Sequence, residues 1–186
     1  MNNRQIYQEF KNLGRDLFLN GDAAARNGNI SLLLSNGRLA ITRSGSLLSD
    51  LLPSDIILVR LEKNKTSPLA SSELPVHRAI ILKTGKKAVV HAHCPYTVAL
   101  ANRYGRTFPN GEYKAKFGYP LVIGQAEDFR IGGYSEEIAA ALKEHGVCVV
   151  ADHGLFAAGD SLKEAYVHLS ALEASSKIAY LERALS

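Results

Sequence analysis

Two apolar runs that end in histidines constrain the fold of this chain most strongly. Residues 87–90 lead into His91-Ala92-His93, and residues 147–151 lead into Asp152-His153-Gly154. Short apolar runs of this kind predict buried strands. Because residues i and i+2 of a strand point to the same face, His91 and His93 can face one ligand together. If the two runs lie side by side in a sheet, His153 adds a third imidazole.

Three imidazoles from two strand ends suit a metal ion. They can occupy three corners of a tetrahedron and leave the fourth open, which is the arrangement of a catalytic rather than a structural zinc site. Either histidine segment alone is more simply explained as a surface or core-edge residue. Their shared position at the ends of buried strands favours the metal site.

Length and composition indicate a globular protein. The 186 residues, 46% of them apolar and 22% charged, predict one domain spanning 1–186 with a sizeable core. No run reaches the ~18 apolar residues that a membrane span needs. The first 19 residues mix charged and apolar side chains at helical spacing, unlike a secretory signal, so we expect a cytoplasmic protein.

The charge balance is mildly basic. Lys and Arg number 22 against 18 acidic residues, which gives a net charge of +4. The basic residues are scattered and are not interleaved with aromatic ones, so we expect no nucleic-acid partner. An anionic small molecule suits this balance.

The two cysteines, Cys94 and Cys148, each lie beside a histidine segment. Nothing marks the chain as secreted, so a reduced pair is favoured, although sequence alone does not exclude a disulfide. Cys94 directly follows His93 and would point to the opposite face of a strand, which disfavours it as a fourth metal ligand.

The periodicity of the chain predicts strands and helices in mixed order. Hairpin-like strand pairs among flanking helices argue for a mainly antiparallel sheet covered by helices, not a doubly wound parallel one. We expect helices over 3–20, 72–84, 96–103, 135–145 and 161–184, and strands over 29–34, 38–42, 55–61, 87–92, 120–124, 147–151 and 155–158.

Three loops are rich in hydrogen-bond donors. They are Gly28-Asn29-Ile30-Ser31, Thr42-Arg43-Ser44-Gly45 and Ser71-Ser72-Glu73, the last of which opens a predicted helix. Glycines let backbone amides approach an anion, hydroxyls add donors, and a helix N-terminus adds partial positive charge, so together they could cradle a phosphate. Taken singly, each is an ordinary turn, hairpin end or helix cap, with Ser72 as the cap.

Glu73 has two interpretations. A first-turn glutamate is commonly explained by the helix macrodipole alone. A partly desolvated carboxylate near a metal-bound substrate could instead transfer protons at neutral pH. His77, one turn later, could orient that carboxylate, although a structural role is more usual for such pairs.

The three donor-rich loops and the two histidine segments make five motifs. In their order along the chain, these motifs resemble the class II aldolase/adducin family, most closely its fuculose-phosphate aldolase branch. The resemblance runs from about residue 5 to about residue 183 and implies a three-layer α-β-α fold with a mainly antiparallel central sheet. It also implies a cytoplasmic homotetramer with sites at subunit interfaces.

The resemblance assigns roles to residues of this chain. It makes Glu73 the general acid/base and Tyr113 a second one that reaches a neighbouring subunit's site, with Tyr104 or Tyr119 as alternatives after a small realignment. The implied zinc ligands are His91, His93 and His153, and another divalent transition metal could replace zinc. The implied phosphate-binding residues are Gly28, Asn29, Thr42, Ser44, Gly45, Ser71 and Ser72.

The implied reaction is reversible cleavage of a ketose 1-phosphate to dihydroxyacetone phosphate and an aldehyde. The ketose could be fuculose, ribulose, 5-deoxyribulose or methylthioribulose 1-phosphate. The same scaffold supports pentulose-phosphate 4-epimerases and methylthioribulose 1-phosphate dehydratases, and the short C-terminal end weakly favours an aldolase over an epimerase. A non-catalytic adducin-like scaffold would not need the full set of histidines together with Glu73, so we expect an enzyme.

Overall fold

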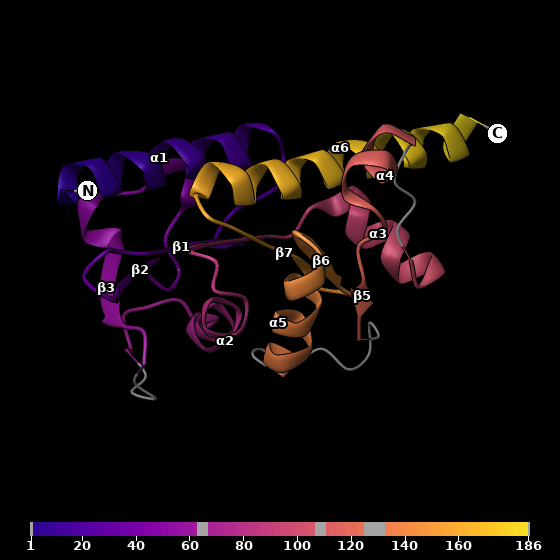
Figure 1. The fold of residues 1–186 in the computed structure, drawn as a ribbon. Helices are drawn as coiled ribbons and strands as arrows, with labels where there is room; N and C mark the ends of the chain where they lie inside the picture. Colours follow the sequence, from indigo (N-terminus) through magenta and orange to yellow (C-terminus); the bar gives the residue numbers. More distant parts are fainter. Residues whose placement is uncertain (1, 63–66, 107–110, 125–132, 186) are drawn as a thin grey trace.

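A single mixed sheet forms the centre of the structure, a computed structural model that describes residues 2–62, 67–106, 111–124 and 133–185. Within these residues the sheet has seven strands in the order β3-β2-β1-β4-β7-β6-β5 (Figure 1). Every neighbouring pair is antiparallel except β5 and β6. The strands are β1 (Asn29–Leu33), β2 (Arg38–Thr42), β3 (Ile56–Arg60), β4 (Ala88–Ala92), β5 (Val122–Ile123), β6 (Val147–Val150) and β7 (Gly154–Gly159).

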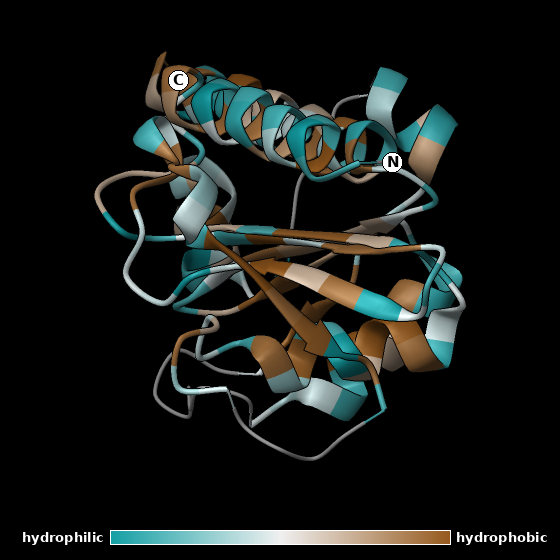
Figure 2. Cartoon of the chain, turned by 90° about the vertical axis from the view of Figure 1, so that its left-hand side faces the viewer, coloured by the Kyte–Doolittle hydropathy of each residue, from teal (hydrophilic) through white to brown (hydrophobic). Residues whose placement is uncertain are grey.

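Helices cover both faces of this sheet. Helices α1 (Asn3–Leu19) and α6 (Leu162–Leu185) lie along one face, and α6 also contacts α3 (Pro95–Tyr104) and α4 (Gly111–Phe117). Helices α2 (Leu74–Thr84) and α5 (Ser135–Glu144) pack against each other below the opposite face. Figure 2 shows the largely apolar strands between the two helical layers. The predicted three-layer arrangement with a mainly antiparallel sheet is confirmed.

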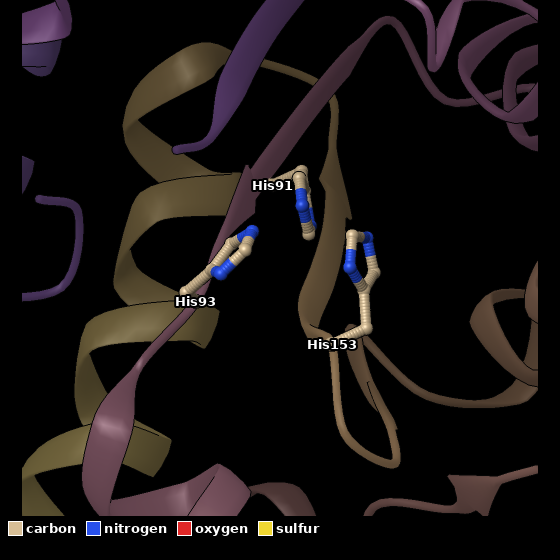
Figure 3. A group of neighbouring side chains, drawn as sticks. All are labelled: His91, His93 and His153. Carbon is tan, nitrogen blue, oxygen red and sulfur yellow. The ribbon is translucent and has the colours of Figure 1, made fainter. Parts of the chain in front are cut away.

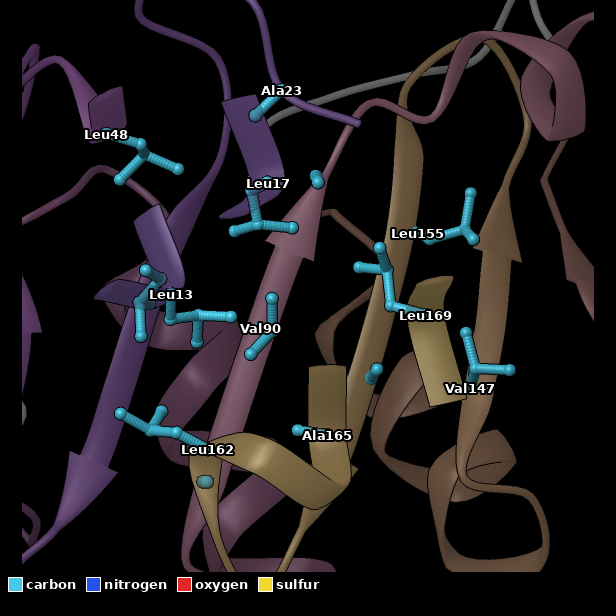
Figure 4. Close-up of a cluster of buried hydrophobic side chains, with 14 of the residues drawn as sticks. Leu13, Leu17, Ala23, Leu48, Val90, Val147, Leu155, Leu162, Ala165 and Leu169 are labelled. Atoms are coloured by element: carbon cyan, nitrogen blue, oxygen red, sulfur yellow. The ribbon is translucent and has the colours of Figure 1, made fainter. Parts of the chain in front are cut away.

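The core has two halves because successive strand residues point to opposite faces. On β4, Ala88 and Val90 face the layer of α1 and α6, whereas Val89 faces α2 and α5. Figure 4 shows the first half, in which Leu13 and Leu17 of α1 meet side chains of the sheet and of α6. All five residues of β4 are buried, which explains why its sequence is a continuous apolar run.

The predicted elements agree with the structure to within two residues at their ends, and helix α4 is an addition to them. The helix expected from residue 72 begins at Leu74, with Glu73 as its N-cap residue. Helix α4 was not expected, because a seven-residue helix gives little periodicity; Tyr113 and Phe117, one turn apart, pack against each other with ring centroids 5.0 Å apart. No helix in the described parts of the chain has the length and apolar character to cross a membrane.

Helix α1 approaches the following segment closely at Gly14. A Cβ atom on Gly14 would overlap the carbonyl oxygen of Leu48 and lie 3.3 Å from Cδ1 of Leu51. Leu48 begins a short 3₁₀ turn (Leu48–Asp50) that packs against α1. The absence of a side chain at Gly14 therefore sets the distance between the two segments.

We expect Gly14→Ala to destabilise the protein. The added methyl group meets backbone, which cannot rotate away, so the free energy of unfolding should fall by about 1–3 kcal/mol. This loss outweighs the helix propensity gained from alanine, roughly 1 kcal/mol. Denaturant unfolding measures the change, with Gly111→Ala as the control because a Cβ there meets no atom within 4 Å. A Gly14→Ala variant as stable as the wild type would contradict the close contact.

Candidate active site

Antiparallel pairing of β4 with β7 brings the three histidines together. His91 lies opposite Phe156 and Ala92 lies opposite Leu155, so the end of β4 meets the start of β7. His93 follows β4, and His153 immediately precedes β7. One ligand atom from each histidine lies within 4.8 Å of the others, and Figure 3 shows the three rings converging on one point. The proximity predicted from the sequence is therefore present.

The environment favours the neutral form of all three imidazoles. Burial lowers the pKa of His93 and lowers that of His91 well below its ordinary value. Burial, and then the neighbouring His93, lowers the pKa of His153 to about 4. A neutral imidazole keeps a lone pair on one nitrogen, which is the form that binds a metal.

A backbone hydrogen bond fixes the tautomer of His91. Its Nδ1 donates to the carbonyl oxygen of Leu155 at 2.9 Å. The lone pair of His91 is then on Nε2, and metal-binding histidines are commonly oriented by such a bond from the other ring nitrogen. Three neutral, converging imidazoles, one of them held in this way, fit a divalent transition metal.

Gly154 makes room for this arrangement. A Cβ atom there would lie 2.5 Å from the carbonyl oxygen of Ala92 and 2.9 Å from Cε1 of His91. Neither atom can retreat without moving β4 or the His91 ring. The glycine after His153 is thus required by the close contact of the two strand ends.

Glu73 lies next to the histidines. Its Oε1 is 3.8 Å from Nε2 of His153, and only 5% of the residue is exposed. Burial raises the pKa of Glu73 to about 7. Glu73 is the N-cap residue rather than part of the first helical turn, and Ser71 Oγ accepts a hydrogen bond from its backbone N–H at 3.2 Å. The prediction of Ser72 as the N-cap residue is therefore wrong.

The three donor-rich loops come together beside the histidines. The backbone N–H of Ser71 donates to the carbonyl of Thr42, and that of Ser44 donates to the carbonyl of Leu69, both at 3.0 Å. The hydroxyl of Thr42 accepts from the N–H of Ile30 at 3.2 Å, which joins the third loop. The structure thus places side by side the segments that the sequence separates by up to forty residues.

The first loop also touches a metal-site residue directly. Asn29 pairs with His91 across β1 and β4. Gly28 has a φ of +91°, and a Cβ on it would lie 2.8 Å from the carbonyl oxygen of His91. The positive φ and the close contact together explain why glycine occupies this position.

The second and third of these loops border a cavity. Ser44, Ser71 and Ser72 line a space of about 710 Å³ that continues past Arg78 along α2. Ser44, Ser72 and Gly45 are exposed, whereas Thr42 is buried. Among the predicted phosphate-binding residues, Thr42 uses its hydroxyl oxygen to accept the Ile30 N–H, and a hydroxyl that accepts in this way can still donate its proton.

His77 does not orient Glu73. It is fully buried, and its Nδ1 lies 2.6 Å from Ser31 Oγ while its Nε2 lies 2.5 Å from Asn29 Oδ1. Burial lowers the pKa of His77 to about 3, so the ring carries one proton. Because Asn29 Oδ1 can only accept, Nε2 donates to it and Nδ1 accepts from the Ser31 hydroxyl. The amide nitrogen of Asn29 remains as the donor on the other side.

The structure does not place Tyr113 with these residues. Only 4% of Tyr113 is exposed, and it packs in the half of the core beneath α6, whereas Glu73 caps α2 on the other face of the sheet. Burial raises the pKa of Tyr113 above its ordinary value. A phenol that reaches a neighbouring subunit must be at the surface, so this placement does not support the predicted role. Tyr104 and Tyr119 are 48% and 55% exposed.

Cys94 and Cys148 are free and buried, in agreement with the favoured reduced pair. Burial raises the pKa of Cys148 to about 12 and that of Cys94 well above its ordinary value. Cys94 is not part of the three-histidine group. Both thiols are therefore protonated members of the interior.

Arg26 lies beside one of the predicted phosphate-binding loops, and the sequence reasoning missed it. Its Nη1 is 3.6 Å from the position of a Cβ on Gly45, so its guanidinium lies beside the second donor-rich loop. The side chain is exposed. An arginine two residues before a glycine loop is a weak signal in a sequence, and only the fold shows that it lies beside Gly45.

Comparison with known proteins agrees with this geometry. Residues 8–180 match the family described as Class II Aldolase and Adducin N-terminal domain. The crystal structure of L-fuculose-1-phosphate aldolase from Thermus thermophilus superposes with a TM-score of 0.89 at 32% identity, covering 98% of this chain and 96% of that one. The fold is thus that of a class II aldolase. The chain belongs to the class II aldolase and adducin family, and the prediction of a lyase is confirmed.

Two curated relatives differ in their reactions. A 5-methylthioribulose-1-phosphate/5-deoxyribulose-1-phosphate aldolase of Rhodospirillum rubrum is 34% identical over 148 residues, covering 74% of this chain and 63% of the relative. A 3-oxo-tetronate 4-phosphate decarboxylase of Escherichia coli K12 is 29% identical over 188 residues, covering 96% and 87%. The chain thus spans less than two thirds of the first relative and most of the second.

We expect Gly154→Ala to weaken metal binding by about tenfold or more, because the methyl group displaces the His91 ring, and loss of ligand orientation commonly costs 10- to 100-fold in affinity. Zinc titration against a competing chelator measures the change. Gly37→Ala is the control: it places a side chain at a positive φ of 75° in the β1–β2 turn but meets no atom within 4 Å. Equal affinity in the two variants would contradict the crowding at Gly154.

Proposed function

We propose that this protein is a zinc-dependent aldolase that cleaves a ketose 1-phosphate to dihydroxyacetone phosphate and an aldehyde. The observation that carries the proposal is the buried carboxylate of Glu73, 3.8 Å from one of three converging histidines and joined to the donor-rich loops through Ser71. The ketose is fuculose 1-phosphate or a related ribulose, 5-deoxyribulose or methylthioribulose phosphate. His91, His93 and His153 are the proposed metal ligands.

In this proposal the metal ion and the loops bind different parts of the substrate. A divalent ion held by the three imidazoles would supply Lewis-acid stabilisation of the negative charge that develops on the substrate carbonyl oxygen. The proposed phosphate site consists of Gly28, Asn29, Thr42, Ser44, Gly45, Ser71 and Ser72, with Arg26 at its edge. The side-chain oxygen of Asn29, Oδ1, accepts a hydrogen bond from His77 Nε2. The side-chain amide nitrogen of Asn29 is therefore the group proposed to donate to the phosphate.

Glu73 moves the proton in this mechanism. Breaking the carbon–carbon bond leaves an electron pair on the carbon next to the carbonyl, and a proton must be delivered there to complete dihydroxyacetone phosphate. Glu73 Oε1 faces the histidine group and is shielded from water, so it can hold that proton and take it back in the condensation direction. The acid/base at the aldehyde oxygen remains proposed as a tyrosine, with exposed Tyr104 and Tyr119 better placed than Tyr113.

Decarboxylation of a phosphorylated 3-oxo acid is the second candidate. Its support is the relative with that activity, which aligns over 96% of this chain. Loss of carbon dioxide also leaves an electron pair next to a carbonyl, so the same metal, phosphate loops and proton donor would serve both reactions. The two candidates differ only in the group that leaves. In either case we propose a single domain over residues 1–186 that works in the cytoplasm as a homotetramer.

We expect Glu73→Gln to lower kcat by about 10²- to 10⁴-fold, because the amide cannot donate a carboxylic proton. The zinc-loaded wild type is given the four ketose 1-phosphates and a 3-oxo-tetronate 4-phosphate, and dihydroxyacetone phosphate and carbon dioxide are measured. Glu137→Gln, at the exposed first turn of α5, is the matched control and should retain full activity.

Release of dihydroxyacetone phosphate from any ketose 1-phosphate supports the aldolase. Conversion of the 3-oxo-tetronate 4-phosphate alone, to carbon dioxide and dihydroxyacetone phosphate, supports the second candidate. A zinc-loaded wild type that converts none of the five compounds contradicts both. Full activity in Glu73→Gln contradicts the role of the carboxylate while leaving the reaction in place.

The position of Arg26 beside the loops allows a separate test of phosphate binding. Replacing it with glutamine removes a cation from the edge of the phosphate loops, so KM should rise by about fivefold, a discounted value for an exposed charge-assisted hydrogen bond. Arg26→Lys keeps the positive charge, so its KM should rise less than that of Arg26→Gln. The value of kcat should change little in either variant. The control is Arg15→Gln, an exposed position on α1. An unchanged KM in Arg26→Gln would remove Arg26 from the site.

A further inference from the structure

We propose that Asn102 is a positioning residue for the metal centre. It holds the turn between β6 and β7 in the conformation that points His153 toward His91 and His93. This inference rests on the proposed function of the three histidines as metal ligands. It concerns a residue in the last turn of α3, outside every motif that the sequence analysis singled out.

The turn that presents His153 has an unfavourable backbone conformation. The N–H of His153 donates to the carbonyl oxygen of Val150 at 3.2 Å, which closes a four-residue turn. Its third residue, Asp152, has a φ of +58°. A positive φ at this position of a turn favours glycine, because a Cβ atom crowds the backbone there, and aspartate adopts it more readily than most side chains but still at a cost relative to glycine. The turn therefore needs support from outside itself.

Asn102 supplies that support through both ends of its amide. Its Oδ1 accepts a hydrogen bond from the backbone N–H of Asp152 at 2.7 Å. Its Nδ2 donates to Asp152 Oδ1 at 3.3 Å. The two bonds hold the backbone and the side chain of the strained residue at once. Asp152 is the residue directly before His153. Its backbone conformation therefore sets the position of the His153 backbone, from which the imidazole extends.

Helix α3 connects the two ligand segments. His93 is followed by Cys94, the N-cap residue of α3, and Asn102 lies two turns later on the same helix. The first turn of α3 is itself anchored, because Glu173 of α6 accepts hydrogen bonds from the backbone N–H groups of Tyr96 and Thr97, both at 2.9 Å. A rigid helix thus begins beside His93 and ends on the turn of His153.

This connection predicts a coupling between Asn102 and metal affinity. Without Asn102, the turn would populate other conformations in which His153 points away from the other two histidines. The apparent dissociation constant rises in proportion as the competent conformation becomes rarer. Both side chains are exposed, so water competes for the hydrogen bonds, and we expect zinc to bind Asn102→Ala about three- to tenfold more weakly than the wild type.

A second substitution separates positioning from general stability. Glycine adopts a positive φ without the crowding of a Cβ atom. Asp152→Gly in the Asn102→Ala background should therefore recover most of the lost affinity, even though it restores no contact. Asn12→Ala is the matched control, since Asn12 also accepts a side-chain hydrogen bond on an exposed helix, from Gln8 at 2.7 Å, but lies on α1.

The experiment is a zinc titration of the full chain against a competing chelator, with a thermal melt of each zinc-free variant. Weaker binding in Asn102→Ala, recovery in the double variant and wild-type affinity in Asn12→Ala support the proposal. Unchanged affinity in Asn102→Ala, or a loss that the glycine does not relieve, overturns it. A wild type that binds no zinc would instead overturn the metal site on which the proposal rests.

Discussion

The antiparallel pairing of β4 with β7 is the interaction on which the site depends. Its backbone hydrogen bonds fix His91 opposite Phe156, so the two strand ends that carry histidines cannot slide past each other. A slip of one residue would turn the His91 side chain to the other face of the sheet. Helices on both faces bury the ladder, and the register is held because each alternative would expose apolar side chains to water.

The elements that sequence reasoning predicted well share a physical cause. Strand β4 and helix α1 each bury a regular pattern of apolar residues, and such patterns can be read from the chain without knowing what covers them. Helix α4 has no pattern of that length, and its stability depends on packing beneath α6. Helix α2 begins two residues later than predicted, with Glu73 as its N-cap residue and Glu73 Oε1 3.8 Å from His153 Nε2.

The candidate site likewise has parts that the sequence predicts and parts that it does not. The histidines and the donor-rich loops were predictable because each motif carries its own chemistry, and the topology then brings them together. The partners of His77 lie 46 and 48 residues away, and no local signal connects them. Tyr113 is buried in the structure, and its sequence context alone gives no signal for this, since a tyrosine in an amphipathic segment can face the interior as readily as a neighbouring chain.

The buried position of His77 has a consequence for the response of the protein to acid. Because the pKa of His77 falls from an ordinary value of 6.5 to about 3 in the folded protein, its neutral ring keeps Asn29 in one orientation across the neutral range. Below pH 6.5 the unfolded chain takes up a proton that the folded ring refuses, so the balance shifts toward unfolding until the pH nears 3. The same histidine that keeps the Asn29 amide in one orientation in mild acid thus makes the fold as a whole more sensitive to acid.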